Sequence, residues 1–128
     1  MAYLLDTNVA IHLRDGDPVV TAKIAALDDA ILMSIVTRVE LEDGVHRDPA
    51  EAPARRARLD TMLGAIPTLA FDDASADACA AIEARSGYSR RKLLDRMIAA
   101  LALVHRATLV TMNADDFSDI AGLSVQAW

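Results

Sequence analysis

Short apolar runs alternate with longer helical patterns along most of this 128-residue chain. The runs that resemble strands lie at residues 2–5, 30–34, 66–71, 108–112 and, less regularly, 123–128. Strands separated by helices are typical of βαβ units, which pair in parallel through right-handed crossovers. We therefore predict an α/β fold, a Rossmann-like three-layer α/β/α sandwich whose central sheet has four to five mainly parallel strands.

Helical patterns fill the intervals between these runs. After the turn "RDGDP", Asp17 is placed to cap a helix that has Pro18 at its first position. Its inward face is expected to carry Val19, Ile24 and Leu27. Further helices are predicted at residues 7–13, 35–46, around 54–63, 72–86 and 90–107, the last being the longest. No repeat and no long linker interrupts the pattern, so we expect residues 1–128 to form a single domain.

The composition limits the class of protein. Hydrophobic residues make up 53% of the chain and aromatic residues only 4%, which predicts an aliphatic core. No apolar run reaches the roughly 18 residues of a membrane span, and no signal peptide is recognisable. The one cysteine, Cys79, lies in an Ala-rich helical segment and is expected to be a packed residue rather than a reactive thiol. These features predict a cytoplasmic protein.

The formal net charge of −6 argues against nucleic acid as a partner when it is taken alone. The charge is unevenly distributed, however. The window from residue 55 to residue 96 holds eight basic and six acidic residues, whereas the rest of the chain holds five basic and 13 acidic ones. Either the basic window is a set of solvated helix faces, or it contacts an anionic partner.

Acids follow two of the predicted strands. Asp6 ends the run "LLD", and Asn113, Asp115 and Asp116 follow the run "TLVTM". The carboxyl ends of parallel strands are where ligands bind in open α/β sheets. Capping of the following helix is the simpler explanation for each acid taken separately. Asp6 follows buried apolar residues, however, and so needs a polar partner.

Two predicted helices carry acids beside their apolar faces. In "SIVTRVELEDGV", Val36 and Val39 mark the inward face, Glu40 falls near Val36, and Asp43 on the same side remains a competitor. In "LLDRMIAALAL", Asp95 lies at the edge of the apolar stripe. A solvent-exposed position is the alternative for both helical acids.

Three or four carboxylates at one crevice repel one another unless a cation neutralises them. Ligands that are all oxygen favour Mg²⁺, with Mn²⁺ as a substitute, over zinc. The histidines show no spacing suited to metal binding; they are His12, His46 and His105. The sequence thus points to a magnesium site formed by acids.

Four motifs in order along the chain resemble those of one family, the PIN-domain ribonucleases, and within it the VapC-type toxins of bacterial toxin–antitoxin pairs. The motifs are "LLDTNV" with Asp6, "VELEDGV" with Glu40, "DRMIAALA" with Asp95 and "LVTMNADDF" with Asp116. The position of the fourth acid varies in the family; we favour Asp116, with Asn113 as a polar helper. The resemblance covers essentially the whole chain and implies the PIN-like form of the predicted sandwich.

The resemblance implies a Mg²⁺-dependent endoribonuclease that cleaves RNA, such as tRNA, with water as the nucleophile. Asp6 and Asp95 would ligate the metal directly, and Glu40 and Asp116 would complete the site through water or a second ion. Supporting polar groups would come from Thr7, Asn8, Thr111 and Asn113. Possible contacts with RNA phosphates are Arg90, Arg91, Lys92 and Arg96, which we place on the same helix as Asp95.

The resemblance also implies partners. A cognate antitoxin would cover the active site with its tail, promoter DNA would be bound only through that antitoxin, and the toxin would form a homodimer and a larger complex with the antitoxin. One alternative is a PIN-domain nuclease that processes RNA outside a toxin–antitoxin pair. A Mg²⁺-binding phosphoacceptor domain is disfavoured, because neither Lys23 nor Lys92 follows a strand.

Overall fold

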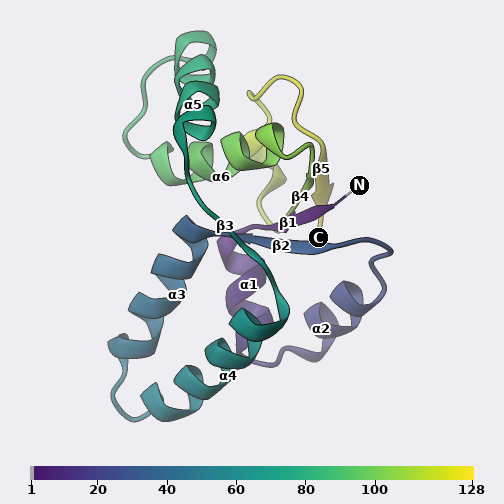
Figure 1. Ribbon diagram of the computed structural model, residues 1–128, viewed down its shortest axis with the longest axis vertical. Coiled ribbons are helices and arrows are strands. Elements are labelled where there is room, and N and C mark those ends of the chain that lie inside the picture. The colour runs from purple at the N-terminus through teal and green to yellow at the C-terminus, as the bar shows by residue number, and fades with distance from the viewer. Residues whose placement is uncertain (1) are drawn as a thin grey trace.

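The computed structural model describes residues 2–128, which form a five-stranded sheet with helices on both faces (Figure 1). The strands are β1 (Tyr3–Leu5), β2 (Ile31–Ser34), β3 (Thr68–Leu69), β4 (Thr108–Thr111) and β5 (Val125–Ala127). They lie in the order β3-β2-β1-β4-β5, and every neighbouring pair is parallel. The prediction of a parallel α/β sandwich is confirmed, and the run at 123–128 does contain an edge strand.

Six α-helices and one short 3₁₀ helix connect the strands. They are α1 (Thr7–Arg14), α2 (Pro18–Ala25), α3 (Ile35–Arg47), α4 (Ala52–Ala65), α5 (Asp73–Ser86), α6 (Leu93–Val104) and the 3₁₀ helix η1 (Ala114–Phe117). Figure 1 shows α5 and α6 on one side of the sheet and α1, α2 and α4 on the other. No helix within residues 2–128 is both long and apolar enough to cross a membrane.

Alternation along β1 divides the core between the two faces. Leu4 packs in a cluster with Ile98 and Leu101 of α6, whereas Leu5 packs in a second cluster with Val9 and Leu41. Successive strand side chains point to opposite faces, so each of these two leucines binds a different helical layer to the same strand. Strand β1 is thereby held between the two helical layers, and Asp6 directly follows its carboxyl end.

Local capping matches the sequence pattern. The Asp17 carboxylate accepts hydrogen bonds from the backbone N–H groups of Val19 at 2.9 Å and Val20 at 3.1 Å, and Pro18 is the first residue of α2. Ser34 caps α3 through the N–H of Val36 at 3.0 Å. Cys79 is buried, and this burial raises the pKa of its thiol, as suits a packed residue.

Three expectations about helix faces and lengths were wrong. Val19 and Val39 are 61% and 63% exposed, and the buried positions are Val20 and Val36. Helix α6 has 12 residues and is shorter than α4 and α5, which have 14 each. It begins only at Leu93, so the basic residues 90–92 precede the helix instead of forming its first turn.

Candidate active site

Asp6 is buried at the carboxyl end of β1, the central strand of the sheet. Its exposed fraction is 5%. One carboxylate oxygen, Oδ1, accepts a hydrogen bond from the N–H of Thr7 at 2.9 Å and so caps α1. The other, Oδ2, accepts from the hydroxyl of Thr111 at 2.7 Å, at the end of the neighbouring strand β4. The capping role considered from the sequence is therefore real, but it occupies only one of the two oxygens.

Glu40 is held by a chain of hydroxyl groups between α1 and α3. The Thr7 hydroxyl donates to Glu40 Oε1 at 2.9 Å, and the two hydroxyl oxygens of Thr7 and Thr37 lie 3.0 Å apart. Since the Thr7 proton is directed to Glu40, Thr37 is the donor in that second bond. Thr37 is fully buried and was missed from the sequence, although its position three residues before Glu40 places it on the same helix face.

Asp95 lies in the first turn of α6 and Asp116 lies in η1. Within residues 2–128, neither carboxylate accepts a hydrogen bond. Asp116 is exposed and Asp95 is half-buried. Among the described residues these two carboxylates therefore have no hydrogen-bond donor, and the charge of Lys92 only partly offsets the rise in the pKa of Asp95.

The charges of the four acids act on one another. The pKa of Asp95 is raised to about 6, first by burial and then by the charges of Asp6, Asp116 and Glu40. Burial also raises the pKa of Asp6, with a further contribution from Asp116, against hydrogen bonds from Thr111 and Thr7 that lower it. Asp115, the neighbour of Asp116, does not contribute to either shift. Asp6, Glu40 and Asp116 therefore lie close enough to Asp95 for their charges to act on it.

The chemistry of these four acids suits a hard divalent cation. The donors are carboxylates, and their mutual repulsion is the quantity that a cation would relieve. Among residues 2–128, no three acidic, histidine or cysteine side chains are already arranged to hold a metal ion. Mg²⁺ usually retains several waters and takes only one or two carboxylates directly, so it does not need three protein ligands already in place.

Two polar residues predicted near the site have different positions. The backbone N–H of Asn113 donates to the Thr111 hydroxyl at 3.0 Å, which orients the group that binds Asp6. Asn8 is exposed, and its backbone oxygen contacts the His12 ring at 2.7 Å. Asp43, the competitor of Glu40, is exposed and pairs with Arg47 at 3.2 Å. Asn113 is therefore part of the support of the site, and Asp43 faces solvent.

The expectation that Arg96 could contact RNA was wrong, because its side chain is buried. Only 3% of the side chain is exposed, and its Nη1 donates to Glu83 at 2.7 Å and to the carbonyl oxygen of Gly87 at 2.6 Å. The Lys92 Nζ lies 3.8 Å from Oδ2 of Asp119, whereas the side chains of Arg90 and Arg91 are exposed. The sequence could not distinguish Arg96 from its basic neighbours, since its partners come from α5 and the segment before α6.

Comparison with known proteins gives a consistent result. The family model described as PIN domain matches residues 3–123. The chain is 26% identical over 135 residues to Ribonuclease VapC2 of Rickettsia felis and 27% identical over 132 residues to the tRNA(fMet)-specific endonuclease VapC of Shigella flexneri. Each alignment covers 100% of this chain and 98% of the relative.

A solved structure agrees with these relatives. The chain is 30% identical, with a TM-score of 0.71, to a chain in the crystal structure of VapBC-5 from Mycobacterium tuberculosis, a member of the VapBC family of toxin–antitoxin systems. The match covers 98% of this chain and 96% of that one. The similarity therefore extends over the whole fold, including the sheet end that carries the acids.

Proposed function

This chain belongs to the PIN domain family, and on that premise we propose that it is a Mg²⁺-dependent endoribonuclease that acts as the toxin of a toxin–antitoxin pair. The observation that carries the proposal is that Asp6, at the carboxyl end of the central strand, acts on the half-buried Asp95, whose pKa is raised first by burial and then by the charges of Asp6, Asp116 and Glu40. The relatives named as a ribonuclease and as a tRNA-specific endonuclease support RNA, and tRNA in particular, as the substrate class.

Each acid has a defined part in this proposal. Asp6 and Asp95 would hold Mg²⁺ or Mn²⁺ directly, and Glu40 and Asp116 would complete the site through water. When bound, the metal supplies an activated water and stabilises the charge that builds on the phosphoryl oxygens. The hydroxyl of Thr111 keeps the Asp6 carboxylate in one orientation, and the hydroxyl of Thr7 does the same for Glu40.

These hydroxyl contacts matter because misplacing a catalytic group is costly. Groups whose rotamers are locked by neighbours need no reorganisation when substrate arrives. Asp6 and Glu40 are locked in this way, whereas Asp95 and Asp116 are free to adjust to the metal and the scissile phosphate. We therefore propose that Asp6 and Glu40 provide the fixed ligands of the site, and that Asp95 and Asp116 adjust their positions when the metal and the RNA bind.

The partners follow from the same proposal. A similar chain is found in a VapBC toxin–antitoxin structure, which supports a cognate antitoxin here. Its tail would cover the acids, and promoter DNA would be bound through the antitoxin alone. We further propose that residues 1–128 form one PIN domain, that it pairs as a homodimer, and that it acts on RNA in the cytoplasm.

The direct test is cleavage of a labelled tRNA pool by the purified protein. We expect cleavage with Mg²⁺ or Mn²⁺, none after EDTA, and recovery when excess Mg²⁺ is restored. Asp95→Asn should be inactive, and Asp43→Asn is the matched control because that acid is exposed and paired with Arg47. Undiminished cleavage in excess chelator, or by Asp95→Asn, would overturn the assignment.

The toxin role needs a separate test from the nuclease activity. Expression of the wild-type chain should arrest growth, and co-expression of the protein encoded by the adjacent reading frame should restore it. If RNA is cleaved but growth is unaffected and no inhibitory neighbour exists, the protein is instead a PIN nuclease that processes RNA outside a toxin–antitoxin pair. Asp95→Asn expressed at the same level separates arrest caused by catalysis from a general burden of expression.

A further inference from the structure

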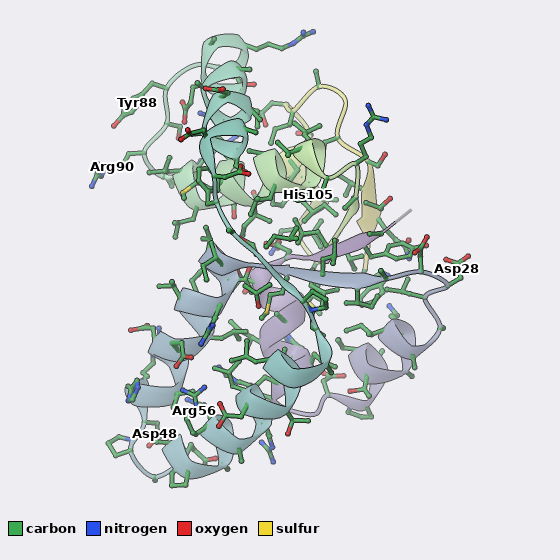
Figure 2. All side chains as sticks on the ribbon, in the orientation of Figure 1. Asp28, Asp48, Arg56, Tyr88, Arg90 and His105 are labelled. Carbon is green, nitrogen blue, oxygen red and sulfur yellow. The ribbon has the colours of Figure 1, made fainter. Side chains whose placement is uncertain are left out.

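The segment between α5 and α6, residues 87–92, presents an aromatic ring and two cations to solvent. We call it the basic loop. Tyr88 is 83% exposed, more than any other large hydrophobic side chain among residues 2–128. Figure 2 shows Tyr88 and Arg90 projecting outward from this loop, away from both helices. A ring this exposed contributes little to the stability of the fold and is available to a partner.

The basic loop is anchored at its base. Gly87 ends α5 with a φ of 87°, a conformation that other residues rarely adopt. Its carbonyl oxygen accepts a hydrogen bond from the buried Arg96, which also binds Glu83 on α5. Because Arg96 directly follows Asp95 on α6, one buried guanidinium connects the start of the loop to the turn that carries a site acid.

The charge of the loop is largely uncompensated. Lys92 has Asp119 at 3.8 Å, but Arg90 and Arg91 are exposed and form no ion pair within residues 2–128. Two adjacent cations without acidic partners are unexpected in a chain with a net charge of −6. Two such cations attract an anion. Because they lie only four and five residues before Asp95, the anion we expect them to bind is the phosphate backbone of the RNA that is cleaved.

Resting on the proposed function, we propose that the basic loop binds unpaired RNA beside the cleavage site, with one base stacked on Tyr88 and the neighbouring phosphates held by Arg90 and Arg91. Unpaired bases stack on exposed aromatic rings, whereas bases inside an A-form duplex keep their own neighbours. The substrate class is therefore RNA with a single-stranded loop or end at the cut, not continuous duplex. Tyr88 acts in specificity and is separate from the acids that perform the chemistry.

Binding is tested with Asp95→Asn protein in Mg²⁺, so that the RNA is not cut. Fluorescence anisotropy would compare a labelled single-stranded oligonucleotide with the same sequence in a duplex. Tyr88→Ala should weaken single-strand binding about 5- to 150-fold, as expected for the loss of one base–aromatic stack. Tyr88→Phe keeps the ring and should bind within about twofold, whereas Tyr88→Leu should resemble Tyr88→Ala because it is apolar but lacks a π face.

The cations have their own readout. Arg90→Gln with Arg91→Gln should flatten the slope of log K against log salt by about 1.4, or roughly 0.7 for each single-strand phosphate contact. The control is Arg58→Gln, an exposed arginine of α4, which should leave the slope unchanged. Thermal unfolding of each variant should match that of its parent, since the substituted side chains are exposed.

Other results would overturn the proposal. One is Tyr88→Ala binding RNA as tightly as its parent; another is equal binding of duplex and single strand by the parent. A change in oligomeric state with Tyr88→Ala, measured by light scattering at the same concentration, would assign the ring to contact with a second copy. The experiments distinguish failure of this proposal from failure of the proposed function. If the wild-type protein cuts RNA and Tyr88→Ala has an unchanged kcat/KM, the role of the basic loop is contradicted and the nuclease function is not.

Discussion

The two halves of the acidic crevice differ in how the protein holds them. On the side of β1, α1 and α3, Asp6 and Glu40 accept hydrogen bonds from Thr111 and Thr7, and Asp6 also caps a helix. On the side of α6 and η1, Asp95 and Asp116 accept none within residues 2–128. The first half is part of the fold as well as of the site, whereas the second contributes charge without stabilising contacts.

This difference teaches which substitutions separate function from stability. Removing an acid that accepts hydrogen bonds leaves its donors unsatisfied. Removing an acid that is only repelled by its neighbours relieves the fold of that repulsion. The four carboxylates should therefore behave alike in a cleavage assay and differently in an unfolding experiment.

The largest expected effect is on catalysis by Asp95→Asn. We expect at least a hundredfold loss in the rate of RNA cleavage, about 2.7 kcal/mol of transition-state stabilisation. The free energy of unfolding of the metal-free protein should stay unchanged or rise, since a carboxylate with a raised pKa has been removed. Cleavage rates and urea unfolding, measured on the same preparation, check the expected loss of activity and the expected stability. A marked loss of stability would show that Asp95 supports the fold.

Asp6→Ala should instead lose both activity and stability. The substitution removes the cap of α1 and the acceptor of the Thr111 hydroxyl, and we expect the free energy of unfolding to fall by about 1–3 kcal/mol. Urea unfolding in EDTA measures this without a contribution from metal. Asp77→Ala, which removes an exposed acid of α5, is the control. Equal stability of wild type and Asp6→Ala would contradict the comparison.

The two adjacent acids of η1 should differ by a smaller amount. Asp116 contributes to the raised pKa of both Asp6 and Asp95, whereas Asp115 contributes to neither. We expect Asp116→Asn to lower cleavage at least tenfold, about 1.4 kcal/mol, and Asp115→Asn to lower it less than threefold. Initial rates under saturating Mg²⁺ are the measurement. The opposite order would assign the fourth position to Asp115.

The smallest effect concerns pH. The pKa of Asp95 in the folded protein is about 6, above its ordinary value of 3.8, so the fold favours the protonated form. This contribution to stability is complete below about pH 4 and is lost as the pH rises through about 6. Metal-free wild type should therefore unfold at lower urea concentration at pH 7 than at pH 5, and Asp95→Asn should show a weaker trend. If the free energy of unfolding of the wild type rose from pH 5 to pH 7, the raised pKa of Asp95 would be contradicted.

Much of this protein was predictable because its signals are local. The alternation of apolar runs and helices predicted the parallel sheet, and "DP" at residues 17–18 predicted the start of α2, since capping depends on neighbours within one turn. Asp6 and Asp116 follow strands that lie side by side, so their proximity follows from the topology. The choice of Glu40 and Asp95 came from helix periodicity together with resemblance to known motifs.

Tertiary structure decided the rest, because one helix can have several packed faces. Helix α3 contacts both α1 and α4. Val39 is exposed, whereas Glu42 pairs with Arg56 of α4 at 2.5 Å. Arg96 is buried by partners from α5 and the loop, which no spacing on its own helix reveals. The sequence by itself determined the order of strands and helices and which acids follow the strands. Only packing determined which hydroxyls hold those acids, because such contacts join residues 33 to 105 positions apart.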